Sequence, residues 1–133
     1  MTLKSGDRIF FDVTPTHMTL QFMSKENLEK EVGECDDSRP ETLDTIDGHD
    51  TVVLRGADVA KLMYTVRYVD APCVVVEKNR PGTSWLRLAY RVSATAGGDL
   101  FTLEGDANTV TLTGAERDLL MAAIESRAWR LFQ

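Results

Sequence analysis

The chain has 133 residues, of which 43% are hydrophobic and 27% charged, and its formal net charge is −6. This length and composition are typical of one globular domain with a single core, and they exclude an intrinsically disordered chain. No apolar run approaches the roughly 20 residues that a membrane-spanning helix needs, and the N-terminus lacks the apolar core of a secretory signal. We therefore expect one intracellular domain over residues 1–133, with no membrane association.

Charge is distributed unevenly along the chain. Residues 25–50 contain ten acidic and three basic residues, a local net charge of −7, whereas residues 55–91 contain seven basic and three acidic ones, a local net charge of +4. A chain that is acidic overall can therefore still present a cationic face to a partner.

The first predicted elements are two strands. Arg8–Val13 and Thr16–Met23 are rich in aromatic and apolar residues, and Pro15 between them indicates the turn of a hairpin. The next segment, 25–48, has dense charge and little apolar periodicity. It predicts an exposed acidic loop inserted into the fold, with room for one helical turn around Lys25–Glu31.

A strand over Asp50–Leu54 follows, and Gly56 separates it from a helix. The helix is indicated by apolar residues at the spacing i, i+3, i+4, i+7, namely Val59, Leu62, Met63 and Val66.

The second half of the chain predicts four strands and a helix. The strands are Cys73–Lys78, Ser84–Ser93, Leu100–Glu104 and Thr109–Leu112. Thr113 and Glu116 form a capping-box pattern that starts the last helix. Its apolar side carries Leu119, Leu120, Ala123, Ile124, Ala128 and Leu131.

The strongest signal is an internal duplication. Asp50–Val66 aligns without a gap to Asn108–Ile124, at a shift of 58 residues. A unit of this kind cannot bury its apolar face alone, so the two copies should pack on each other about a pseudo-two-fold axis. The sequence therefore predicts an α+β domain of two ββββα-like repeats, about 5–68 and 72–132. We expect antiparallel sheets with the helices on one side and the other sheet face open.

This pattern resembles the architecture of the Whirly proteins, the PUR-repeat proteins and the positive-cofactor-four coactivators. The resemblance rests on the segment Thr109–Leu120, a last strand that passes through a capped turn into a helix, and on its copy from Asp50. It implies a curved sheet that binds single-stranded DNA or RNA, with the helices holding the repeats together.

The best candidate site lies on the strand around residue 87. Alternation places Trp85, Arg87 and Arg91 on one face, opposite the core residues Leu86 and Leu88. An aromatic ring beside two guanidinium groups suits stacking on unpaired bases and neutralisation of phosphates. A solvated face, or a Trp85 that covers a neighbouring strand or subunit, is the alternative. Three further cations complete the candidate set, although a solvated surface position is the favoured interpretation of each: Lys78, Arg80 and Arg67.

The sequence offers no candidate for catalysis. His17 and His49 are its two histidines, and neither accompanies a nucleophile motif. Glu34, Asp36 and Asp37 do not match the spacing of a calcium loop. We therefore expect no catalytic residue, no metal site and no cofactor, and an enzyme whose site these motifs do not reveal is kept as a further alternative.

Two further expectations concern partners. In the alternative function, the protein is an interaction, inhibitor or adaptor module whose segment 25–50 contacts a basic protein or mimics a nucleic acid. The acidic residues of this alternative are Asp36, Asp37, Asp44 and Asp47. The aromatic C-terminus, with Trp129 and Phe132, is expected to dock either on the sheet of its own chain or on a second subunit. The second outcome, a homodimer formed through the helices, is slightly favoured.

Overall fold

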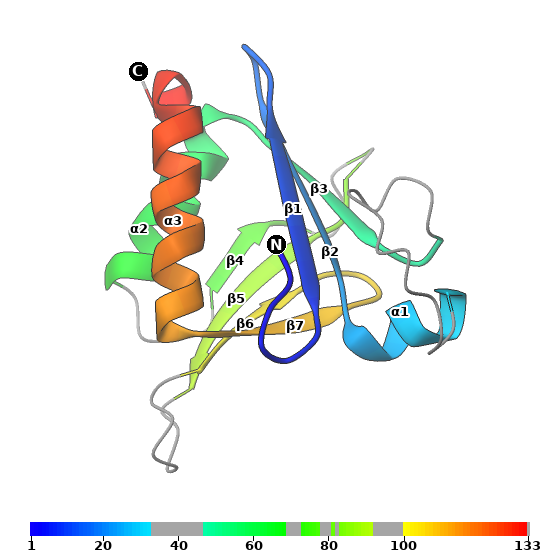
Figure 1. Cartoon of the computed structure of the whole chain (residues 1–133). Coiled ribbons are helices and arrows are strands. Elements are labelled where there is room, and N and C mark those ends of the chain that lie inside the picture. Colours follow the sequence, from blue (N-terminus) through cyan, green and yellow to red (C-terminus); the bar gives the residue numbers. More distant parts are fainter. Residues whose placement is uncertain (33–46, 69–72, 78–80, 82, 92–99, 133) are drawn as a thin grey trace.

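Two antiparallel sheets and three α-helices make up the fold (Figure 1), which the computed structural model describes for residues 1–32, 47–68, 73–77, 81, 83–91 and 100–132. The three-stranded sheet has the order β1 (Arg8–Val13), β2 (Met18–Met23), β3 (Asp50–Leu54). The four-stranded sheet has the order β4 (Cys73–Val76), β5 (Leu86–Arg91), β6 (Leu100–Glu104), β7 (Thr109–Thr113). The helices are α1 (Lys25–Val32), α2 (Gly56–Tyr68) and α3 (Gly114–Ala128), and α3 ends in a 3-10 turn, η1 (Trp129–Phe132).

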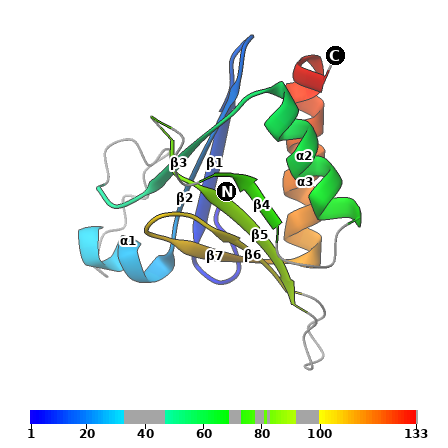
Figure 2. The same ribbon diagram turned by 180° about the vertical axis from the view of Figure 1, so that it is seen from behind.

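The long helices α2 and α3 stand together at one side of the two sheets, as both views show (Figures 1 and 2). One hydrophobic core joins the inner faces of both sheets to these helices, and it includes Leu20, Val52, Leu88, Leu62 and Leu120. The predicted α+β class is therefore confirmed. None of the helices in the described ranges is both long and apolar enough to cross a membrane.

The segment predicted as an acidic loop over 25–48 begins with a helix of eight residues, α1, which is longer than the one helical turn expected there. The Ser24 hydroxyl accepts the Asn27 N–H at 3.2 Å and caps its first turn, and Leu28 packs against the buried Met23 of β2. Low apolar periodicity hid this helix, because a single Leu anchors it. Residues 33–46 of the segment lie outside the described residues.

The capping residues predicted for α3 behave as the sequence indicates. The Thr113 hydroxyl accepts the N–H of Glu116 at 3.2 Å, and the Glu116 carboxylate accepts the N–H of Thr113 at 3.0 Å. Asp58 repeats half of this arrangement at the start of α2, where it accepts the N–H of Arg55 at 3.0 Å. Both long helices thus begin with an acidic residue that satisfies a backbone donor.

The duplicated segments adopt the same local structure, since β3–α2 and β7–α3 are strand–helix units 58 residues apart. Two contacts join a residue of one copy to its own counterpart in the other. Asn108 donates to the Asp50 carboxylate at 2.7 Å, and Arg67 donates to Glu125 at 2.6 Å. Counterparts meet in this way where they lie beside a two-fold axis.

The first repeat also has a short equivalent of β4. The N-terminal ammonium of Met1 donates to the Ile9 carbonyl at 2.9 Å, and the Ile9 N–H donates to the Met1 carbonyl at 3.1 Å. Thr2 forms an isolated antiparallel bridge with Arg8. The stretch Met1–Thr2 thus pairs with the outer edge of β1, as β4 pairs with the outer edge of β5.

Each repeat covers the edge of the other repeat's last strand. At β7, Thr111 donates its N–H to the Asp7 carboxylate at 2.9 Å. At β3, Val53 donates its N–H to the Thr83 hydroxyl at 2.6 Å, and Ser84 donates its N–H to the Thr51 carbonyl at 2.8 Å. These contacts block two edges that could otherwise pair with a second chain.

Candidate nucleic-acid interface

Strand β5 orients the predicted site. Leu86 and Leu88 are buried in the core, as predicted, and Arg87 between them lies on the opposite face of the sheet. The strand begins at Leu86 rather than at Ser84, because the residues before it bond to β3. Trp85 therefore precedes the strand, and it is partly exposed.

A row of side chains crosses the outer face of the four-stranded sheet at the level of Arg87. Strand register places Val74, Arg87, Glu104 and Thr109 side by side. Val74 and Thr109 are exposed, and the Arg87 and Glu104 side chains retain about 40% of their accessible surface. Solvent therefore reaches this face of the sheet at all four strands.

Arg87 has an acidic neighbour across the sheet. One of its guanidinium nitrogens lies 3.9 Å from a Glu104 carboxylate oxygen. Exposed pairs of this kind contribute about 0–1 kcal/mol, because water and salt screen them. A phosphate group can therefore compete with Glu104 for Arg87.

Arg67 lies elsewhere, in a groove between α2 and α3. It donates to Glu125 at 2.6 Å, and the groove of about 350 Å³ is lined by both of these residues and by Arg117 and Asp118. The structure therefore separates Arg67 from the sheet face that carries Arg87. Lys78, Arg80 and the side chain of Arg91 lie outside the described residues.

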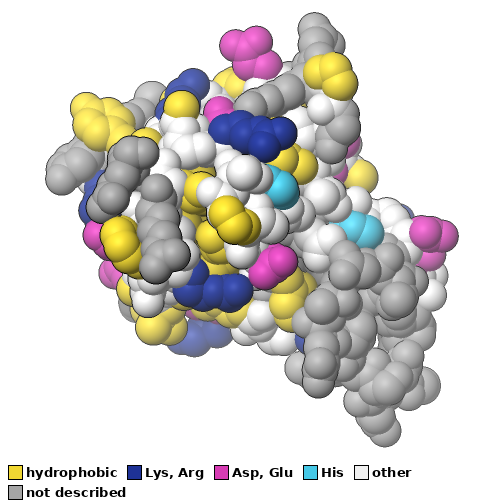
Figure 3. Space-filling view, turned by 90° about the horizontal axis from the view of Figure 1, so that it is seen from above, with side chains coloured by type: hydrophobic (Ala, Val, Ile, Leu, Met, Phe, Trp, Pro, Cys, Tyr) yellow, Lys and Arg dark blue, Asp and Glu magenta, His cyan; other side chains and the backbone are white. Residues whose placement is uncertain are grey.

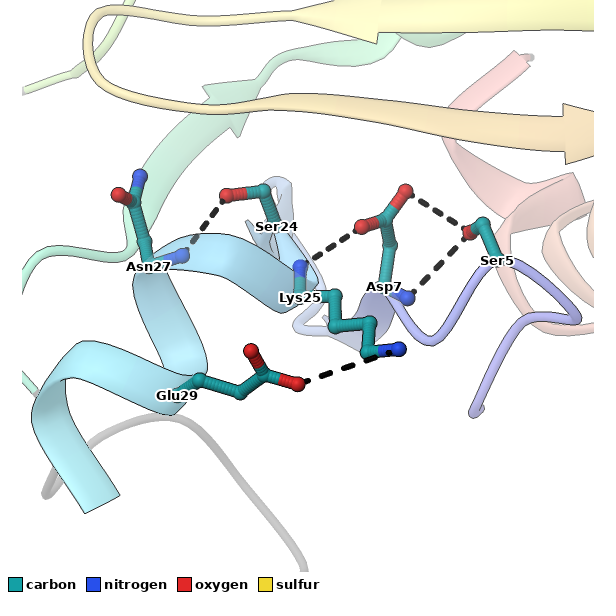
Figure 4. Close-up of polar contacts among 6 residues, drawn as sticks. All are labelled: Ser5, Asp7, Ser24, Lys25, Asn27 and Glu29. Carbon is teal, nitrogen blue, oxygen red and sulfur yellow. Dashed lines mark hydrogen bonds and ion pairs between the residues drawn. The ribbon is translucent and has the colours of Figure 1, made fainter. Parts of the chain in front are cut away.

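The structure describes both ends of the acidic segment 25–50 that the alternative function uses. Asp47 is exposed, whereas Asp36, Asp37 and Asp44 lie outside the described residues. At the other end α1 is held in place by a polar cluster (Figure 4), in which the Asp7 carboxylate accepts the Lys25 N–H at 2.7 Å and the Ser5 hydroxyl at 2.8 Å. The described start of the acidic segment is thus a helix with a defined position.

A scan against protein-family models and searches of curated proteins and of solved structures gave no match.

Sequence analysis did not predict the central polar contact of the fold. The Asp50 carboxylate is buried and accepts the N–H groups of Asp106, Ala107 and Asn108 at 2.7–3.2 Å. It also accepts the Ser84 hydroxyl at 3.0 Å and the Asn108 side-chain amide at 2.9 Å. Five donors from the second repeat therefore converge on one carboxylate of the first.

Asn108, the counterpart of Asp50, in turn bonds to residues of the first repeat. Its side-chain oxygen accepts the Ser24 N–H at 2.9 Å and the Asn27 amide at 2.8 Å, and its side-chain nitrogen donates to the Gly48 carbonyl at 2.7 Å. The available signal was the position of Asp50 and Asn108 at the head of the two copies. Polar residues at matched positions next to buried strands indicate a contact between copies.

The aromatic C-terminus docks in part on its own chain. Leu131 packs against the core, and its carbonyl oxygen approaches α2 so closely that a Cβ atom on Gly56 would collide with it. Trp129 remains 47% exposed. The side chain of Phe132 lies outside the described residues, and the expectation of a homodimer through these residues stays a prediction.

The pKa of the Met1 ammonium lies below its ordinary value of 8.0. Burial lowers the pKa, and the nearby positive charge of Arg8 lowers it further.

Proposed function

We propose that the protein is a non-catalytic module that binds single-stranded nucleic acid on the outer face of its four-stranded sheet. The observation that carries the proposal is the exposed row on this face, with Arg87 at its centre and Trp85 two residues before it. A partly exposed indole and a guanidinium group two residues apart in the sequence can stack on a base and contact its phosphate.

The order of the elements supports the same function. Two units of antiparallel strands followed by a helix resemble the Whirly and PUR-repeat architecture, in which the sheet binds the nucleic acid. In this chain, α2 and α3 stand at one side of the sheets (Figure 2), which leaves the outer row accessible. Lys78, Arg80 and Arg91 belong to the proposed surface by their positions in the sequence around β5.

The test is a titration with single-stranded oligonucleotides in a Trp129→Phe background, which leaves Trp85 as the only tryptophan. We expect its fluorescence to be quenched, with an affinity that falls steeply between 50 and 200 mM salt, roughly as counterion release requires. Arg87→Ala should weaken binding at least several-fold, whereas Lys61→Ala removes one exposed positive charge on α2 and serves as the matched control. Unchanged emission and no salt-sensitive binding would refute the proposal.

A second candidate function uses the acidic segment to contact a basic protein partner. The anchoring of α1 by Asp7 favours it, since the segment then starts from a fixed point on the domain. Within α1, Lys25 pairs with Glu29 and Lys30 with Glu26, so the excess negative charge lies beyond the helix. Neutralising Asp36, Asp37, Asp44 and Asp47 together should abolish such binding while oligonucleotide binding persists.

A further inference from the structure

A groove runs between β1 and α3, at the outer edge of the three-stranded sheet. One half, of about 220 Å³, is lined by Met1, Phe11 and Leu119 among others, and the other, of about 460 Å³, by Val13 and Trp129 among others. Arg127 lines both halves and therefore marks their junction. The groove thus follows β1 from the N-terminus to the hairpin turn.

Large apolar side chains remain accessible along this groove. Leu119 is 65% exposed, and Met1 and Trp129 are also exposed. The view from above, onto the hairpin tip and the C-terminal end of α3, shows hydrophobic side chains at the surface with basic and acidic ones beside them (Figure 3). Apolar surface concentrated along one groove is typical of a binding site.

The second repeat shows what fills the equivalent position. There β4 pairs with the outer edge of β5 and packs next to α2, with Cys73 opposite Leu88. Phe11 of β1 pairs with Leu20, and Leu88 of β5 pairs with Leu103. Leu20 and Leu103 pair in turn with Val52 and Val110, which match each other in the duplication. Phe11 is therefore the counterpart of Leu88. Among the described residues, no strand lies opposite Phe11 on its outer side.

The backbone of β1 is oriented to receive such a strand. The Thr14 N–H donates to the His17 carbonyl at the hairpin turn. In an antiparallel pair the backbone N–H and C=O groups of every second residue point to the partner strand, so those of Asp12 and Phe10 point to β2. The backbone groups of the residues between them point outward. Ile9 confirms this alternation, since its outward N–H and C=O groups bond to Met1. The outward N–H and C=O groups of Phe11 and Val13 extend the same edge beyond the end of the Met1 pairing.

The charge of the groove selects the partner. Its described lining contains the Arg127 guanidinium and the Met1 ammonium but no acidic side chain. Asp12 next to it lies 3.6 Å from Arg127 and is largely exposed. A second copy of the chain would set these cations against each other, whereas an acidic residue on a separate peptide would complement them.

We propose that this groove binds an extended apolar peptide segment of a partner protein, which carries an acidic residue and adds to the edge of β1 as a fourth strand. Backbone hydrogen bonds to Phe11 and Val13 supply the register, and Leu119 and Trp129 contact alternate side chains of the peptide. The added strand completes the sheet as β4 completes the sheet of the second repeat.

The probe is a capped peptide with the sequence of residues 70–77 and serine in place of Cys73, Asp-Ala-Pro-Ser-Val-Val-Val-Glu. Titrated into the full chain and followed by NMR, it should shift the amide signals of Phe11 and Val13 and slow their hydrogen exchange at least tenfold. A version with lysine in place of both acidic residues should bind at least fivefold more weakly. Leu119→Ser should weaken binding, and Tyr64→Ser, at a residue of α2 that is 61% exposed, is the matched control.

Backbone pairing is tested directly by two N-methylated peptides, modified at adjacent residues in the middle of the probe. One of the two N–H groups faces β1 and the other points away, so one peptide should lose binding at least tenfold and the other should keep it. Equal affinities of the two peptides would overturn the proposal. So would shifts confined to α2 and β4, an absence of binding at millimolar peptide, or a dimer of the chain that Leu119→Ser disrupts.

Discussion

The buried carboxylate of Asp50 offers the sharpest test of how the two repeats are joined. In Asp50→Ala, the backbone N–H of Asn108 and one of the two N–H groups of its side-chain amide lose their acceptor while they remain buried. Each buried donor left without a partner costs about 1–3 kcal/mol. The donors from Asp106 and Ala107 are at exposed positions, so water can replace the carboxylate there. We therefore expect a loss of about 4 kcal/mol, a large part of the roughly 5–15 kcal/mol that stabilises an ordinary domain.

Urea denaturation followed by circular dichroism measures this loss as a shift in the midpoint at constant slope. Asp50→Asn keeps one acceptor oxygen and should cost less than Asp50→Ala. The matched control is Asp47→Ala, an exposed aspartate three residues earlier, which should change the free energy of unfolding by less than about 0.5 kcal/mol. A loss below about 1 kcal/mol for Asp50→Ala would refute the argument, because it would mean that the five donors find other partners.

Three further predictions follow from the matched positions and from the sheet face. Gly56→Ala should destabilise the fold by about 1–3 kcal/mol, because its Cβ atom would collide with the backbone of η1. A Cβ atom on the matched Gly114 would meet no atom within 4 Å, so Gly114→Ala should be neutral or stabilising by up to about 1 kcal/mol. Thermal denaturation compares the two variants. A double-mutant cycle on Arg67→Ala and Glu125→Ala should give a coupling energy below about 1 kcal/mol, because both side chains are about half exposed. The coupling energy should decrease as salt is added, and a value above about 2 kcal/mol would contradict this prediction. Glu104→Gln removes the carboxylate opposite the cation of β5 and should raise oligonucleotide affinity several-fold; an unchanged or reduced affinity in the same fluorescence titration counts against the proposed sheet face.

Local patterns predicted the elements whose burial is periodic. The strands Arg8–Val13, Asp50–Leu54 and Leu100–Glu104 have the predicted bounds, because side chains on alternate sides of a strand leave a direct record in the sequence. Helix α1 left no such record. One leucine and a capping serine hold it, and the Asp7 carboxylate that fixes its first turn is 18 residues away in the sequence.

The candidate site was predictable only in part, because it depends on contacts between elements. Alternation correctly places Arg87 opposite the buried Leu86 and Leu88. The acidic neighbours of Arg87 and Arg67 follow from strand register and from the packing of α2 on α3, which a single sequence does not encode locally. For Asp50, the matched position of Asn108 indicates a contact between the copies, but the five donors are brought together only when the two repeats pack.

The exchange of edge contacts between the repeats has a consequence for how the chain folds. Thr111 of β7 bonds to Asp7 across 104 positions of the sequence, and Val53 of β3 bonds to Thr83 across 30. Neither half can therefore form the contacts at the outer edge of its last strand before the other half is present. Folding should occur in one cooperative step with an entropic barrier set by these distant contacts. The amide protons of Thr111 and Val53 should then exchange with solvent only when the whole domain opens.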